Sequence, residues 1–188
     1  NPQTPDTGTS AWWLNQWAIR DGVLQPLASV WFRQRPSTFH QVEEGWYIVT
    51  ETGELWQVLD GMATPVSGVP APEDLTVIGE DLYLSAETPE RGREPYRVRG
   101  LEVFPLGDLV PGPDDAFPHH FNACGERVCF AAGTSVEGRI WWTSDGFDSR
   151  PLGPGLAANM PDTMPYNGAL YFTSSPPDAP RVLYRTGD

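Results

Sequence analysis

The chain has 188 residues, of which 39% are hydrophobic, and its eight tryptophans are ample for the core of one domain. Its net charge is −13, and all 12 basic residues are arginine against 25 acidic residues. An acidic surface repels phosphate, which argues against nucleic acid and anionic membranes as partners, and no run reaches the ~20 apolar residues of a membrane span. Evenly spread glycine and proline indicate frequent turns and many short strands.

The chain begins with a polar stretch, NPQTPDTGTS, which we expect to form a flexible arm over residues 1–10. The stretch lacks the pattern of a signal peptide and is typical of an end left by processing or of an artificial boundary. We expect residues 11–188 to form a single domain.

One short motif, an aromatic residue followed closely by glycine, recurs along the chain. Its copies are WAIRDG at 17–22, WQVLDG at 56–61, YRVRG at 96–100, WTSDG at 142–146 and LYRTGD at 183–188. The spacing is roughly 40 to 45 residues, the period of a four-stranded propeller blade. The sequence therefore predicts an all-β, β-propeller-like fold with four blades of four short antiparallel strands. The repeats span about 14–30, 37–69, 73–109, 117–155 and 160–188.

Runs of apolar residues between turn signals predict the strands within each repeat. In chain order they are 14–20 and 23–30; 37–44, 46–51, 54–59 and 62–69; 74–78, 81–86, 93–99 and 101–109; 117–124, 127–132, 139–144 and 149–152; and 163–166, 169–173 and 181–185. The first repeat lacks its early strands and the last lacks its final strand. We therefore expect the N-terminal segment to close the ring so that no sheet edge stays open, with completion by a second chain as the alternative.

Asp-Gly and Asn-Gly pairs favour two-residue hairpin turns with positive φ. We expect structural turns at Asp21-Gly22, Asp60-Gly61, Asp145-Gly146 and Asn167-Gly168. The aromatic residue of each copy is expected to pack between neighbouring blades.

Two cysteines, Cys124 and Cys129, flank four residues, Gly-Glu-Arg-Val, that suit a turn. If these four residues form the turn, the two side chains face each other and can close a disulfide, which would favour an oxidising compartment. Two buried thiols are the alternative, and two cysteines are too few for a structural zinc site.

Several segments resemble a known bacterial repeat. They are ELWQVLDG at 54–61, LTVIGEDLYLSA at 75–86, GREPY at 92–96 and DLVPG at 108–112. On these residues the chain is similar to the bacterial ELWxxDGT-type (hyalin-like) β-propeller repeat family over about 14–188. The resemblance implies a surface or secreted binding or scaffold module without a catalytic signature. The chain departs from the family pattern at Arg99, where the turn aspartate is expected.

Asp114, Asp115, His119 and His120 crowd one loop, and such side chains can hold a transition metal. They are weak metal candidates, because adjacent histidines on an extended chain point to opposite faces and a solvated loop is the alternative. No serine lies in a Gly-x-Ser-x-Gly setting. We therefore expect no catalytic residues, no cofactor and no enzyme activity.

Tryptophan-containing doublets recur in the expected strands, and neighbouring residues in a strand point to opposite faces. Burial of both faces between blades is one interpretation, and exposure of one aromatic for a sugar or a protein is the other. The interface candidates near the N-terminal arm are Trp12, Trp13, Trp31 and Phe32.

Together these features predict a non-catalytic, extracytoplasmic interaction or scaffold module, periplasmic, cell-surface or secreted, and an accessory subunit of a larger bacterial assembly. The partner is expected to be a protein, with a glycan as a further possibility, and the chain is not expected to span a membrane. The alternatives are a carbohydrate-binding, lectin-like propeller and a propeller hydrolase.

Overall fold

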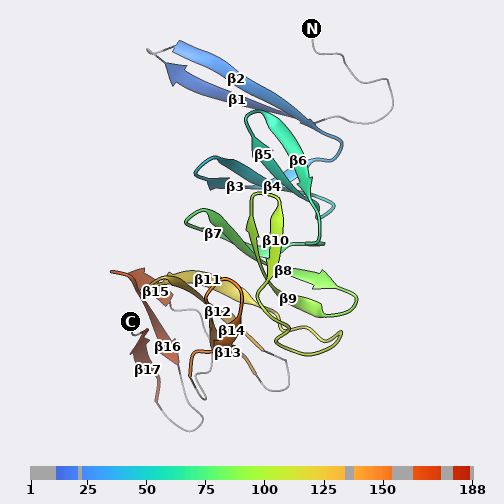
Figure 1. Ribbon diagram of the computed structural model, residues 1–188. Coiled ribbons are helices and arrows are strands. Elements are labelled where there is room, and N and C mark those ends of the chain that lie inside the picture. The colour runs from blue at the N-terminus through green and yellow to red at the C-terminus, as the bar shows by residue number, and fades with distance from the viewer. Residues whose placement is uncertain (1–11, 21–22, 134–137, 154–162, 175–179, 187–188) are drawn as a thin grey trace.

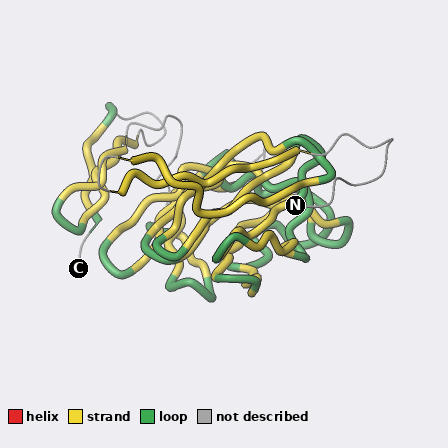
Figure 2. The backbone as a smooth tube through the Cα atoms, turned by 90° about the horizontal axis from the view of Figure 1, so that it is seen from above, coloured by secondary structure: helices red, strands yellow, loops and turns green. Residues whose placement is uncertain are grey.

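The computed structural model describes residues 12–20, 23–133, 138–153, 163–174 and 180–186. These residues form strands and loops without a helix, so the all-β prediction is confirmed (Figure 2). The expected arm over residues 1–10 lies outside the described residues.

The strands form five antiparallel sheets in which each strand pairs with its neighbour in sequence. The N-terminal hairpin consists of β1 (Trp12–Arg20) and β2 (Val23–Phe32). Sheet I consists of β3 (Pro36–Val42), β4 (Gly45–Thr50), β5 (Leu55–Leu59) and β6 (Met62–Val66). Sheet II consists of β7 (Glu73–Ile78), β8 (Asp81–Thr88), β9 (Gly92–Arg99) and β10 (Glu102–Pro105).

Sheet III consists of β11 (His119–Cys124), β12 (Arg127–Ala132), β13 (Ile140–Ser144) and β14 (Ser149–Pro151). Sheet IV consists of β15 (Thr163–Tyr166), β16 (Ala169–Ser174) and β17 (Val182–Arg185). The sheets follow one another from the hairpin at one end of the molecule to sheet IV at the other (Figure 1). Each of the five overlaps one of the sequence ranges expected for a repeat, although the hairpin extends beyond 14–30 at both ends and sheet I begins at Pro36.

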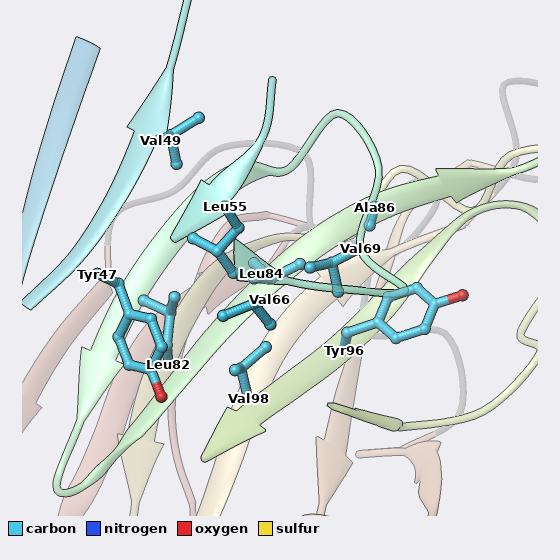
Figure 3. Packing of buried hydrophobic residues seen from close by; sticks show 10 residues of the cluster. All are labelled: Tyr47, Val49, Leu55, Val66, Val69, Leu82, Leu84, Ala86, Tyr96 and Val98. Atoms are coloured by element: carbon cyan, nitrogen blue, oxygen red, sulfur yellow. The ribbon is translucent and has the colours of Figure 1, made fainter. Parts of the chain in front are cut away.

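A separate apolar cluster joins each sheet to the next. Between sheets I and II, for example, Tyr47 and Leu55 pack against Leu82, Leu84 and other side chains (Figure 3). The inner strands β8 and β9 are buried almost throughout, because sheets cover them on both faces. The stacking of sheets therefore buries both faces of the inner strands, as the near-continuous apolar sequences of these strands predict.

The repeated aromatic residues lie in these clusters. Trp56 belongs to the cluster between the hairpin and sheet I, Tyr96 to the next, Trp142 to that between sheets II and III, and Tyr184 to the last. Each points from its own sheet toward the preceding one. The prediction that these aromatics pack between neighbouring sheets is confirmed for these four copies.

Ring closure by the N-terminal segment is not observed in this structure. Within the described residues β1 and β2 pair only with each other, and the hairpin and sheet IV lie at opposite ends of the series (Figure 1). The sheets contain two, four, four, four and three strands, rather than the expected blades of four throughout.

The turns are partly as predicted. Asp60-Gly61 and Asn167-Gly168 both have positive φ at each residue, as two-residue hairpin turns require. Asp145-Gly146 instead opens a four-residue loop, because the Asp145 carboxylate accepts hydrogen bonds from the backbone N–H groups of Phe147 and Asp148. The expected turn at Asp21-Gly22 lies outside the described residues.

A disulfide joins Cys124 and Cys129 across the β11–β12 hairpin, with 5.9 Å between the two Cα atoms. The turn has two residues rather than four, since Cys124 pairs with Arg127. The cysteines are therefore diagonal neighbours in the ladder and do not face each other directly.

Candidate functional site

A groove lies where the two-stranded N-terminal hairpin meets the four-stranded sheet I. Val30 and Phe32 of the hairpin are buried against Ile48 and Val58 of sheet I. Two strands cover only part of a four-stranded face. Beside them, over β5 and β6, a groove of about 820 Å³ remains.

The wall of the groove on the hairpin side comes from β2 and the loop after it, and includes Ser29, Val30 and Phe32. The floor comes from sheet I and includes Trp56 and Ala63, with Thr50 and Glu54 at one end and Gly61 and Met62 at the other. The groove therefore runs along β5 from one end of the strand to the other.

Trp56 is the central aromatic of the floor. Its ring meets the Phe32 ring edge-on, with 5.7 Å between ring centroids. Its indole Nε1–H donates to a carboxylate oxygen of Glu54 at 3.3 Å. Met62 at the rim is 70% exposed. The groove thus offers an aromatic surface and a flexible apolar side chain beside a carboxylate, a combination suited to a protein segment.

The sequence predicted interface residues in this region, and the structure corrects one of them. Phe32 is 1% exposed and belongs to the core, so it is not available to a partner as a free surface. Trp12 is 41% exposed, and the Arg35 guanidinium lies 5.3 Å from its ring centroid. The structure describes the backbones of Trp13 and Trp31, which pair with each other, but not their side chains.

The floor residues Glu54, Ala63 and Met62 were missed as site residues. Glu54 and Trp56 were noticed only as part of the repeat signature. The sequence cannot distinguish the copy that borders the groove, because other copies of the same motif are covered by a neighbouring sheet.

The weak metal candidates do not form a metal centre. Among the residues that the structure describes, no group of three His, Cys, Asp or Glu side chains could hold an ion. Asp115 accepts a hydrogen bond from the backbone N–H of Arg93, and His119 Nδ1 lies 2.8 Å from the Phe117 carbonyl oxygen. The backbone of Asp114 lies so close to Gly92 that a Cβ there would collide with it.

The two histidines nevertheless lie closer together than the sequence predicted. His120 has a φ of 56° at an irregular point in β11, and the His119 and His120 rings are 4.7 Å apart. The left-handed residue breaks the alternation of an extended strand, so the two side chains do not diverge to opposite faces.

Charged side chains in sheet II form a cluster that the sequence did not indicate, in which Asp81 and Arg97 are buried and Arg99 is exposed. Arg99 pairs with Asp81 through two hydrogen bonds of 2.7 and 2.9 Å. The Arg97 guanidinium lies against the rings of Phe104 and Phe147, 4.4 and 4.6 Å from their centroids, and the two rings meet each other edge-on. Since Phe147 belongs to the β13–β14 loop, this contact ties sheet II to sheet III.

Glu94, at the repeat position equivalent to Glu54, is completely buried in sheet II. Its two carboxylate oxygens accept hydrogen bonds from the backbone N–H groups of Leu109 and Val110 at 3.0 and 3.2 Å. Burial raises the pKa of Glu94 to about 7, against the opposing effect of these two hydrogen bonds. Glu94 therefore fixes the long loop between β10 and β11 and titrates near neutral pH.

No protein-family model and no curated protein matches the chain. The N-terminal domain of Nup159 superposes with a TM-score of 0.38 at 11% identity, covering 87% of this chain and 50% of that chain. A chain from a Saccharomyces cerevisiae complex of Dbp5 bound to Nup159, Gle1, IP6 and ADP gives 0.39 at 10% identity, covering 87% and 49%.

The chain therefore spans about half the length of the solved chains it matches. Both TM-scores lie below 0.5, so the two likenesses assign neither a fold family nor a function. Within the described residues, no helix has the length and apolarity that crossing a membrane requires.

Proposed function

We propose that this protein is a non-catalytic interaction module that binds a protein partner in the groove between the N-terminal hairpin and sheet I. The observation that carries the proposal is the partly covered face of sheet I, where Trp56 and the exposed Met62 border a groove of about 820 Å³. Aromatic and methionine side chains are enriched where proteins bind one another. Rigid sheets on one side would keep the groove in shape before a partner arrives.

The net charge of −13 supports a basic partner, because complementary charge speeds association and selects among partners. An extracytoplasmic location is part of the proposal and is supported by the Cys124–Cys129 disulfide, since disulfides persist in oxidising compartments. Membership of the ELWxxDGT-type repeat family, and a role as accessory subunit of a bacterial assembly, rest on the sequence resemblance alone.

We further propose that the sheets act as blades of a propeller-type array. The stacking of antiparallel meanders and the aromatic residues between them support this arrangement. Small-angle X-ray scattering tests whether the chain closes into a ring. A compact disc would support closure by the N-terminal segment, whereas an extended arc would rule it out for the isolated chain.

The groove is tested by a substitution at its rim. Met62→Glu places a charge at the rim of the groove, at a position that is already 70% exposed, so the fold should tolerate it. Met164→Glu is the matched control, since Met164 is 58% exposed on sheet IV, far from the groove. The wild-type protein is immobilised, and a protein that it retains from an extract of the source cells is purified. Calorimetry then measures the affinity of this partner for the wild type, for Met62→Glu and for Met164→Glu.

A loss of at least tenfold in affinity for Met62→Glu, with an unchanged affinity for Met164→Glu, is the expected result. Equal affinities for all three proteins would place the partner elsewhere and refute the groove as the docking site. A glycan array separates the lectin-like alternative. Glycan binding that is lost with Met62→Glu, in the absence of any protein partner, would favour the lectin.

A further inference from the structure

The edge of the hairpin that borders the groove is a free strand edge. Among the residues whose side chains the structure describes, the hairpin lines the groove from β2, which lies next to β6, and within the described part of the chain β2 pairs only with β1. The backbone N–H and C=O groups along the outer side of β2 therefore have no strand partner. An exposed strand edge is a template for pairing with another chain.

The second strand edge at the groove is less suitable. The outer strand of sheet I on this side is β6, and it contains Pro65, which cannot donate a backbone hydrogen bond. Proline on an edge strand blocks the addition of a further strand. Residues 27–32 of β2 contain no proline.

We propose that the groove receives an extended segment of the partner, which pairs with the free edge of β2 as a third strand and lies over Trp56 and Ala63. The inference deepens the function proposed above and rests on it. Strand addition would extend the two-stranded hairpin toward the width of the sheet beneath it. It would cover the apolar surface that the hairpin leaves open.

The geometry also determines the chemistry of the added segment. Side chains in a strand alternate between two faces, so every second residue of the segment would point at the floor of the groove. These residues should be apolar, because the floor presents Trp56, Ala63 and the buried Val58 beneath them. The residues between them would face solvent on a protein of net charge −13, and near Glu54, so they should be basic.

The probe is a nine-residue peptide with blocked ends in which valine and lysine alternate. Two controls keep its length. One has the same composition with the valines in one block, and the other has glutamate in place of lysine. We expect the alternating peptide to bind the intact protein and each control to bind at least tenfold more weakly by calorimetry.

Hydrogen exchange identifies the edge that is used. On binding, those amides among residues 29–32 that point to the free edge should exchange at least fivefold more slowly, with smaller changes at residues 61–64. Protection at 61–64 instead would move the added strand to β6 and overturn the proposal. Binding without protection at 29–32 would overturn it as well.

Backbone methylation separates strand pairing from binding by side chains alone. Two further peptides carry N-methyl groups on alternate residues, one set on each edge of the peptide strand. One of the two should lose binding and the other should keep it. Equal binding of both would refute strand addition.

The outcomes also separate this inference from the proposed function. If a protein partner depends on Met62 but neither the peptide nor the partner protects residues 29–32, strand addition is wrong and the groove remains the docking site. If affinity for the partner is unaffected by Met62→Glu, the proposed function itself fails.

Discussion

Two neighbouring interfaces between sheets contain the same repeated motif, but its aromatic residue is buried in one and partly exposed in the other. Between sheets I and II, four strands face four strands, and Tyr96 is buried in a closed cluster. Between the hairpin and sheet I, two strands face four, and Trp56, at the equivalent repeat position, remains partly exposed in a groove. The comparison shows that exposure of the motif depends on how many strands lie above it.

The glutamate two positions before each aromatic follows the same rule. Glu94 is buried and accepts two backbone N–H groups from the loop after β10. Glu54 is exposed, and its carboxylate accepts the Trp56 indole N–H. One repeated carboxylate thus fixes a loop in sheet II and lies beside an open groove in sheet I.

The largest expected effect comes from truncating the two aromatics. Tyr96→Ala should destabilise the fold by about 3–5 kcal/mol, the usual cost of removing a buried aromatic side chain. Trp56→Ala should cost about half as much, because solvent already reaches its ring. Urea unfolding of both variants measures the two free energies. Equal losses would mean that the hairpin protects sheet I as well as sheet II does.

The buried Glu94 predicts a pH dependence of similar size. Its pKa rises from 4.5 to about 7 on folding, so the folded state binds the proton more tightly than the unfolded state. The associated stability is present below about pH 4.5 and is lost as the pH rises through 7, by about 3 kcal/mol in total. In Glu94→Gln this part of the pH dependence should vanish, as unfolding free energies at pH 5 and pH 8.5 would show.

Raising the pH should strengthen the two hydrogen bonds from the amides of Leu109 and Val110, because the ionised carboxylate is the stronger acceptor, and the loss of stability comes from burying its charge. Hydrogen exchange at these two residues is a direct readout. An identical pH profile for wild type and Glu94→Gln would contradict the buried titration.

The disulfide extends the comparison to the cluster between sheets III and IV. Replacing Cys124 and Cys129 together with alanine should cost about 2 kcal/mol, from the entropy of closing so short a loop. Without reductant, treatment of the wild-type protein with an alkylating agent should leave the intact mass unchanged. A mass increase of two alkyl groups would show free thiols and refute the bond.

The smallest effect is expected where sheets II and III are joined by Arg97. Arg97→Lys keeps the charge and loses the planar group that contacts the rings of Phe104 and Phe147. The expected loss is about 1 kcal/mol, measured by urea unfolding. In a Phe147→Ala background, replacing Arg97 with lysine should cost no further stability. If the losses of the two single variants instead add up in the double variant, the contact between Arg97 and Phe147 has no stabilising role.

Much of the local structure follows from the sequence. The turn at Asp60-Gly61 was predicted from its residue types, because few other pairs tolerate positive φ at both positions. The same reasoning failed at Asp145, where the side chain caps two backbone N–H groups and favours a longer loop. Turn composition alone does not reveal such a side-chain bond.

The charged cluster of sheet II could not be predicted for a different reason. Arg99 stands where three other copies of the motif in this chain have aspartate, and its partner Asp81 lies 18 residues earlier at the start of β8. The two meet only because β8 and β9 are paired in one register. Likewise, the left-handed His120 overturned an expectation that holds for regular strands.

By itself, the sequence determined the strands, the antiparallel order within each sheet and the aromatic residues between sheets. These features depend on local patterns, since turn residues limit φ and alternation assigns each side chain to a face. Only the tertiary structure decided which copies of the motif are covered and which border a groove. That depends on the number and placement of strands stacked on each face, because burial is a property of the neighbouring sheet rather than of the motif.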